Sequence, residues 1–168
     1  MRSILFDTNI ILDFILHREP FFEDSSKALN LAYDKRIIGF VSASTITDLY
    51  YIIRKNKNKN IAKNFITDLI EFIEIADVNK EIILQALKSD LNDFEDSVQE
   101  QTASVYGIQY IITRNIDDYK LSVVEAITPG FFLEKMMNGG WAMDKWGFAK
   151  FWMLNYLTTE NTVLMNNV

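Results

Sequence analysis

The segment ILFDTNIILDFILHREPFF, residues 4–22, decides how the chain folds. Its first three residues are apolar, and Asp7-Thr8-Asn9, a trio suited to turns and helix starts, follows at once. Residues 10–16 are then apolar except for Asp13, and Glu19-Pro20 ends the pattern. We therefore expect a short buried strand that ends in an acidic loop, followed by a buried helix.

The same order of elements recurs along the chain. Further short apolar runs, typical of strands, lie at 37–41, 75–76, 110–112 and 123–127, and stretches with helical spacing separate them. We expect Ser25 or Ser26 to cap the second helix, and Ser44 or Thr45 to open the helix after residue 41. Alternating strands and helices predict an α/β fold of three layers, in which helices cover both faces of a central parallel sheet of about four to five short strands.

Composition narrows the possible chemistry. The 168 residues include no cysteine and one histidine, His17, which excludes disulfides, thiolate zinc sites and multi-histidine metal sites. An enzyme of this composition would rely on carboxylates. A net charge of −6 argues against a generic nucleic-acid coat protein, although acids that share a metal site are compatible with an RNA substrate.

The two ends of the chain lead to two further expectations. Neither a secretory signal nor a run of about 18 apolar residues is evident, so we expect a cytoplasmic protein without a membrane span. We expect residues 1–137, which contain the alternating strands and helices, to form one domain. Residues 138–168 contain all three tryptophans, and we expect an aromatic-rich, helical extension that either packs on the domain or binds a partner.

Acidic side chains follow or precede the predicted strands. Sites in parallel sheets form at the carboxyl ends of strands, where these side chains are expected to meet. They are Asp7, Asp48, Asp93, Asp96, Asp117 and Asp118, together with Asn115. Taken singly, each of them is also explained as a helix cap or a turn residue. Together, clustered carboxylates repel unless a hard cation such as Mg²⁺ or Mn²⁺ joins them, which favours phosphoryl chemistry.

Four sequence motifs resemble those of the PIN-domain family, which includes the VapC-type toxins of bacterial toxin-antitoxin pairs. The opening segment resembles the first motif of that family, and FVSASTITDLYYIIRK (40–55) the second. LNDFEDSVQEQTA (91–103) resembles the third, and YIITRNIDDYK (110–120) with VEAITPGFFLEKM (124–136) the fourth and the usual carboxyl-terminal end. Their joint occurrence in the right order is specific, although each short string is weak.

The resemblance implies roles for particular residues. Asp7, Asp48, Asp96 and Asp118 are implied as catalytic, and the same four with Asp93 and Asn115 as ligands of Mg²⁺, or of Mn²⁺ in its place. Thr8, Asn9 and Thr113 are implied to orient ligands or contact phosphate, although Asn9 and Thr113 equally suit turn caps. Two positions depart from the family pattern: Asp48 stands where glutamate is usual, and Asn115 is neutral where some relatives carry aspartate.

The implied activity is metal-dependent hydrolysis of RNA phosphodiester bonds by a type II toxin, which forms a homodimer and binds a cognate antitoxin. The basic residues Arg54, Lys55, Lys57 and Lys59 would contact the RNA backbone, unless they form only a solvated corner between helices. Two alternatives stay open at this point. One is a non-catalytic PIN-like module that binds RNA or protein, and the other is a small-molecule phosphatase.

Overall fold

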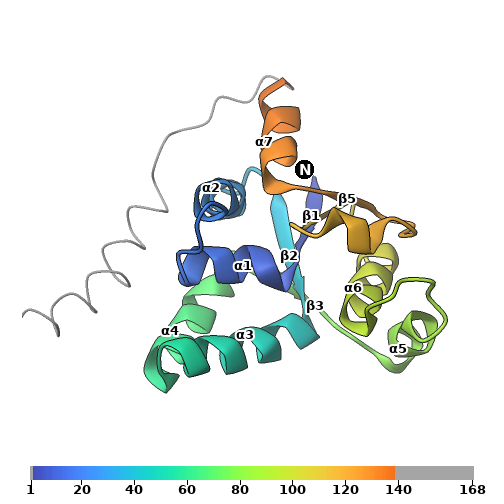
Figure 1. Cartoon of the computed structure of the whole chain (residues 1–168), viewed down its shortest axis with the longest axis horizontal. Coiled ribbons are helices and arrows are strands. Elements are labelled where there is room, and N and C mark those ends of the chain that lie inside the picture. The colour runs from blue at the N-terminus through green and yellow to red at the C-terminus, as the bar shows by residue number, and fades with distance from the viewer. Residues whose placement is uncertain (1, 139–168) are drawn as a thin grey trace, which may run out of the picture.

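The computed structural model describes residues 2–138, so the predicted extension at 138–168 lies, apart from Asn138, outside the described residues (Figure 1). The elements in order are β1 (Ser3–Phe6), α1 (Thr8–Ile15), α2 (Phe22–Tyr33), β2 (Ile38–Ser42), α3 (Ala43–Asn56), α4 (Lys59–Leu69), β3 (Ile73–Ala76), α5 (Lys80–Ala86), α6 (Phe94–Val105), β4 (Tyr110–Ile112), the 3₁₀ turn η1 (Ile116–Tyr119), β5 (Glu125–Ile127) and α7 (Pro129–Asn138).

Within residues 2–138, five strands form one sheet in the order β3-β2-β1-β4-β5, and every neighbouring pair is parallel. The strand of the opening segment, β1, is central: Leu5 lies opposite Phe40 of β2 and opposite Ile111 of β4. The predicted parallel sheet is confirmed. All five carboxyl ends therefore face one edge, where a site is expected to form.

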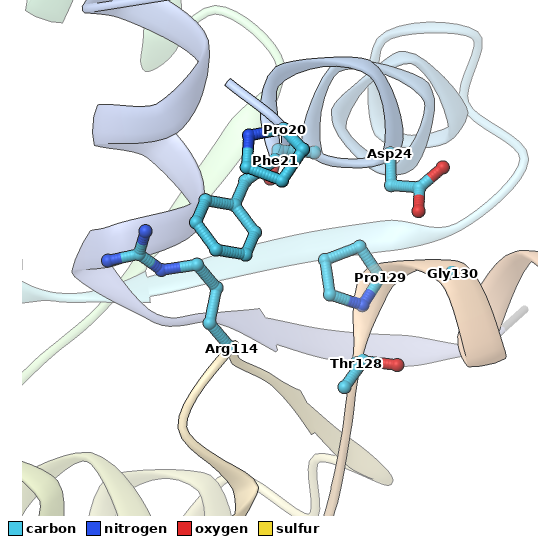
Figure 2. Close-up of a pocket in the computed structure, with 8 residues that line it drawn as sticks. Pro20, Phe21, Asp24, Arg114, Thr128, Pro129 and Gly130 are labelled. Atoms are coloured by element: carbon cyan, nitrogen blue, oxygen red, sulfur yellow. The ribbon is translucent and has the colours of Figure 1, made fainter. Parts of the chain in front are cut away.

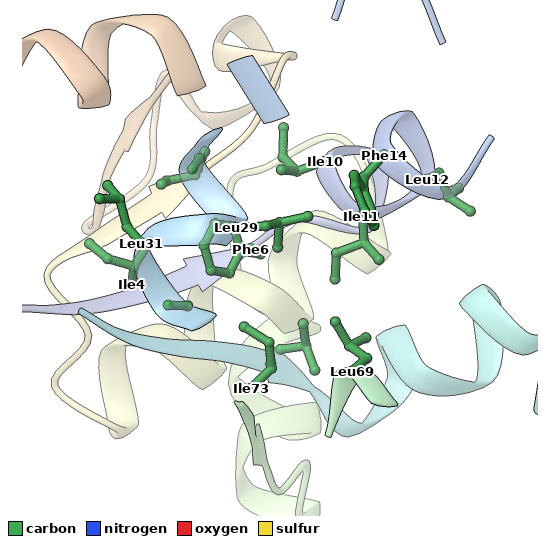
Figure 3. Close-up of a cluster of buried hydrophobic side chains, with 14 of the residues drawn as sticks. Ile4, Phe6, Ile10, Ile11, Leu12, Phe14, Leu29, Leu31, Leu69 and Ile73 are labelled. Carbon is green, nitrogen blue, oxygen red and sulfur yellow. The ribbon is translucent and has the colours of Figure 1, made fainter. Parts of the chain in front are cut away.

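Helices cover both faces of the sheet, which confirms the three layers. Side chains alternate between the faces of a strand, so Ile4 and Phe6 point to one side and Leu5 to the other. The first side forms the larger core with residues of α1, α2, α3, α4 and α7, part of which Figure 3 shows. The second side packs against Ala103 of α6 and Tyr119 of η1. Figure 1 shows α1, α2 and α7 on the opposite side from α5 and α6.

Two helices begin earlier than the sequence indicated. Helix α2 starts at Phe22, and Ser26 lies inside it, where its hydroxyl donates to the Phe22 carbonyl oxygen at 2.6 Å instead of capping the helix. Helix α3 is capped by Ser42, whose hydroxyl accepts a hydrogen bond from the Thr45 amide at 3.2 Å. Because the last residue of β2 is itself the cap, no loop separates the strand from the helix. Asp48 therefore lies in the second turn of α3.

None of the helices between residues 2 and 138 is long and apolar enough to cross a membrane.

Candidate functional site

The carboxylate of Asp7 lies at the carboxyl end of the central strand and is held by three other segments. The Thr113 hydroxyl donates to its Oδ2 at 2.8 Å, and the Gln99 side-chain amide donates to its Oδ1 at 3.2 Å. The Asn9 side-chain amide lies 3.4 Å from Oδ2. Only 3% of Asp7 is exposed. The ends of β1 and β4 and the helices α1 and α6 thus fix this carboxylate in one orientation.

Helix α6 brings Asp96 to the same edge. Asp93 caps the helix, with its Oδ1 accepting the backbone amides of Glu95 at 2.7 Å and Asp96 at 3.3 Å. Burial raises the pKa of Asp96 to about 6, and the charges of Asp7, Asp93 and Asp118 add to the rise. The hydroxyl of Tyr119 opposes it by donating to Asp96 Oδ1 at 2.9 Å. Asp96 is therefore a carboxyl group surrounded by acids.

Two more acids belong to this group. Glu95 accepts a hydrogen bond from the Thr8 hydroxyl at 2.9 Å. Burial raises the pKa of Glu95, this hydrogen bond opposes the rise, and the charges of Asp48, Asp7 and Asp93 add to it. Burial also raises the pKa of Asp48. The "acidic edge", defined here as Asp7, Asp48, Glu95, Asp96 and Asp118, is thus a set of carboxylates from four segments, in which neighbouring negative charges add to the raised pKa values of Glu95 and Asp96.

A buried ion pair supports the acidic edge from the side of α1. Asp13 is 0% exposed, and its Oδ1 lies 3.2 Å from Arg114 Nη1 and 4.0 Å from Arg18 Nη1. Burial raises the pKa of Asp13, and the charge of Arg114 opposes the rise. Arg114 Nη2 also donates to Asn9 Oδ1 at 3.3 Å. A chain of contacts therefore runs from Asp13 through Arg114 and Asn9 to Asp7.

The donor set fits a hard divalent cation in its chemistry. Carboxylate oxygens without histidine or cysteine are the ligands that Mg²⁺ and Mn²⁺ prefer, and a cation would offset both the burial and the neighbouring negative charges that raise the pKa of Asp96. Among residues 2–138, however, no three acid, histidine or cysteine side chains stand already grouped around one point. A metal would therefore have to draw the carboxylates of the acidic edge together or bind some of them through water.

The other predicted site residues have different surroundings. Thr113 is fully buried, and its hydroxyl both donates to Asp7 and accepts the Asn115 backbone amide at 3.0 Å. Asn115 and Asp118 line a shallow hollow of about 380 Å³ beside η1. The basic residues lie elsewhere: Arg54 and Lys55 are in the last turn of α3, and Lys57 and Lys59 at its junction with α4. With 14 residues, α3 is about 20 Å long, so the structure does not bring its last turn to Asp7.

Five residues of this neighbourhood escaped prediction, namely Asp13, Glu95, Gln99, Arg114 and Tyr119. Local signals existed for two of them: Asp13 is the single acid of an otherwise apolar helix, and Gln99 follows Asp96 by three residues and so shares its face of α6. Arg114 and Tyr119 carry no such signal in the residues around them, and only the fold brings Arg114 to Asp13 and Tyr119 to Asp96.

Comparisons with known proteins agree with this architecture. In solved structures, a DNA-bound VapBC complex from Salmonella typhimurium matches with 16% identity, 77% of this chain and 99% of that chain covered, and a TM-score of 0.60. A toxin-antitoxin complex from Klebsiella pneumoniae matches with 21% identity, coverage of 76% and 98%, and a TM-score of 0.59. VapC20 of Mycobacterium tuberculosis, described as a toxin that cleaves the sarcin-ricin loop, matches with 14% identity, coverage of 73% and 99%, and a TM-score of 0.58.

At these identities the solved structures show a shared fold. No protein with a curated description matches the chain. Residues 3–117, most of the described part, match the family description of the PIN domain. This match agrees with the parallel sheet, with the acids at its carboxyl edge and with the four motifs. The chain belongs to the PIN-domain family.

Proposed function

We propose that this protein is a Mg²⁺- or Mn²⁺-dependent ribonuclease, the toxin of a type II toxin-antitoxin pair. The observation that carries the proposal is the acidic edge, in which burial and neighbouring acids raise the pKa of Asp96 to about 6. Carboxylates that disfavour one another's charge are costly in a folded protein unless a cation is bound. The family match supports a nuclease, and phosphodiester hydrolysis is a typical use of such sites.

Asp7 and Asp96 are the residues that would hold the cation, with Asp48, Glu95 and Asp118 near enough to contribute charge. When bound, Mg²⁺ or Mn²⁺ would supply an activated water and stabilise the charge on the leaving oxygen. The protein's own groups would set the geometry. Thr113, Gln99 and Asn9 fix the Asp7 carboxylate, while Tyr119 holds Asp96 by donating to its Oδ1.

Cleavage of labelled single-stranded and structured RNA by the purified chain tests this function. We expect cleavage with Mg²⁺ or Mn²⁺, none with chelator, and a loss of about 100-fold or more for Asp7→Asn and for Asp96→Asn. Asp34→Asn is the matched control, because Asp34 follows α2 and precedes β2 and so lies at the opposite edge of the sheet. Cleavage in chelator, or cleavage that survives both substitutions, would overturn the proposal. Binding of RNA without cleavage would favour the non-catalytic module.

The proposal includes an antitoxin partner, a homodimer and a cytoplasmic location. Solved relatives described as toxin-antitoxin complexes support the partner. The product of an adjacent short reading frame is the protein to test: we expect it to co-purify with the chain and to inhibit RNA cleavage. Light scattering of the purified chain tests the dimer, and a monomeric mass at micromolar concentration would refute it.

A further inference from the structure

A pocket of about 190 Å³ lies beside the acidic edge, and no role has been assigned to it. Its lining includes Phe21 of the α1–α2 connection, Asp24 of the first turn of α2, Arg114 after β4, and Pro129 and Gly130 at the start of α7. In Figure 2, Phe21 and Arg114 lie along one side, and Pro129 lies across from them. The pocket therefore opens at the same edge of the sheet as Asp7.

Contacts within the protein connect the pocket to the acidic edge. Arg114 directly follows Thr113, whose hydroxyl donates to Asp7. The guanidinium of Arg114 also donates to Asn9, which in turn contacts Asp7. A group in the pocket and a phosphate at Asp7 would thus touch neighbouring residues of one network. This is the relation expected between a nucleotide base and an adjacent phosphate of a single strand.

The shape and surfaces of the pocket suit a flat ring. Phe21 is 42% exposed, and the guanidinium of Arg114 lies over one face of its ring at 4.5 Å from the centroid, which leaves the exposed part of the ring for a flat ligand. Sequence-specific proteins bind single-stranded RNA by stacking splayed-out bases on aromatic rings and guanidinium planes. The pocket volume of about 190 Å³ admits one ring system.

The charges of the pocket favour a neutral ligand with N–H donors over a phosphate. The charge of Arg114 is already compensated by Asp13 at 3.2 Å. Asp24 has no ion-pair partner among residues 2–138, and its Oδ2 lies 2.9 Å from the position that a Cβ on Gly130 would take. A free carboxylate repels an anion and accepts hydrogen bonds from the exocyclic amines of adenine, cytosine and guanine.

We propose that this pocket is a specificity subsite that binds a base carrying an exocyclic amine next to the scissile phosphate. The base stacks on Phe21, whose ring is supported by Arg114, and its amine donates a hydrogen bond to Asp24. The proposal rests on the proposed ribonuclease function. It names Asp24 as the residue that selects the base and Phe21 as the residue that supplies affinity.

The test uses the full chain and fluorogenic oligouridine substrates in which one position at a time carries adenine, cytosine or guanine. We expect kcat/KM to rise about tenfold for an amino-bearing base at one position beside the cut, a ratio worth about 1.4 kcal/mol. Asp24→Asn should remove this preference, and Asp34→Asn, at the other end of α2, should keep it. Gly130→Ala should weaken the preference, since its Cβ displaces the Asp24 carboxylate without changing charge.

Phe21→Ala separates binding from chemistry. We expect KM to rise about tenfold with kcat unchanged, because stacking on an aromatic ring contributes affinity of this order. Tyr51→Ala is the matched control, since Tyr51 is an exposed aromatic residue of α3 outside the pocket. Phe21 and Asp24 are exposed, so both variants should fold, and their melting temperatures check this. A base preference that is absent, or that survives both Asp24→Asn and Phe21→Ala, would overturn the subsite.

A wild-type chain that cleaves no RNA with either metal would refute the proposed function but leave the subsite testable. In that case, fluorescence anisotropy measures binding of uncleavable 2′-O-methyl oligonucleotides with the same single substitutions. The subsite would be supported if oligonucleotides containing adenine, cytosine or guanine bind more tightly than oligouridine and if Asp24→Asn abolishes this difference. Equal binding of all strands would refute it.

Discussion

Arg114→Met should destabilise the protein by leaving Asp13 without its nearest cation. Asp13 is 0% exposed, and its remaining partner, Arg18, lies 4.0 Å away compared with 3.2 Å for Arg114. Removing one partner of a buried ion pair typically costs about 3–5 kcal/mol, since the other charge stays desolvated. For a chain of this length, that corresponds to a fall in melting temperature of about 6–20 °C.

The loss should depend on pH in a defined direction. Burial already holds the pKa of Asp13 above its ordinary value of 3.8, and Arg114 opposes that rise. In Arg114→Met the folded-state pKa of Asp13 should rise further, so the folded protein binds a proton that the unfolded chain releases. Stability is then lost as the pH rises through the window from 3.8 to the raised folded-state value. The deficit should therefore be larger at pH 7 than at pH 4.5.

Urea unfolding of the metal-free chain, followed by circular dichroism at the two pH values, measures these free energies. Arg114→Met with Asp13→Asn should recover part of the stability at pH 7, because no charge is then buried alone. Asp13→Asn by itself should cost less than Arg114→Met, since Arg114 is partly exposed and can be hydrated. A loss below about 1 kcal/mol for Arg114→Met that is equal at both pH values would refute the reasoning.

Three further substitutions test single contacts. Gly39→Ala should cost about 1–3 kcal/mol in thermal melts, because its Cβ would lie 2.5 Å from Ile73 Cδ1; an unchanged melting temperature would contradict this packing. Ser42→Ala should cost about 1 kcal/mol in urea unfolding through loss of the α3 cap, and a neutral effect would argue against that cap. Tyr119→Phe should move the Asp96 pKa in the metal-free protein above about 6 in a carboxyl-carbon NMR titration, and an unmoved pKa would exclude the hydrogen bond.

The parallel sheet and its alternation with helices were predictable from the sequence because their signals are local. The apolar residues Ile4, Leu5 and Phe6 of the central strand are buried on both faces, and Asp93 caps α6, as a turn or cap role for that acid allowed. The two wrong helix starts show the limit of such signals. A serine near a helix start can cap it, as Ser42 does, or bond back to a carbonyl inside it, as Ser26 does. Only the neighbouring backbone decides between these outcomes.

That Asp7, Asp96 and Asp118 lie near one another agrees with the expectation from the sequence, since parallel strands present their carboxyl ends at one edge, whereas Glu95 was not expected there. What surrounds them was not predictable from the sequence. Gln99 and Thr113 reach Asp7 across 92 and 106 residues, and Arg114 pairs with Asp13 across about as many. These residue types are common, and whether they hydrogen-bond or pair with an acid depends on which helix face or loop carries them in the folded protein. The sequence alone thus determined the order of strands and helices and most of the acids at the sheet edge, because these patterns are periodic and local. The tertiary structure decided the supporting contacts and the pocket, because these join segments that only the folded sheet brings together.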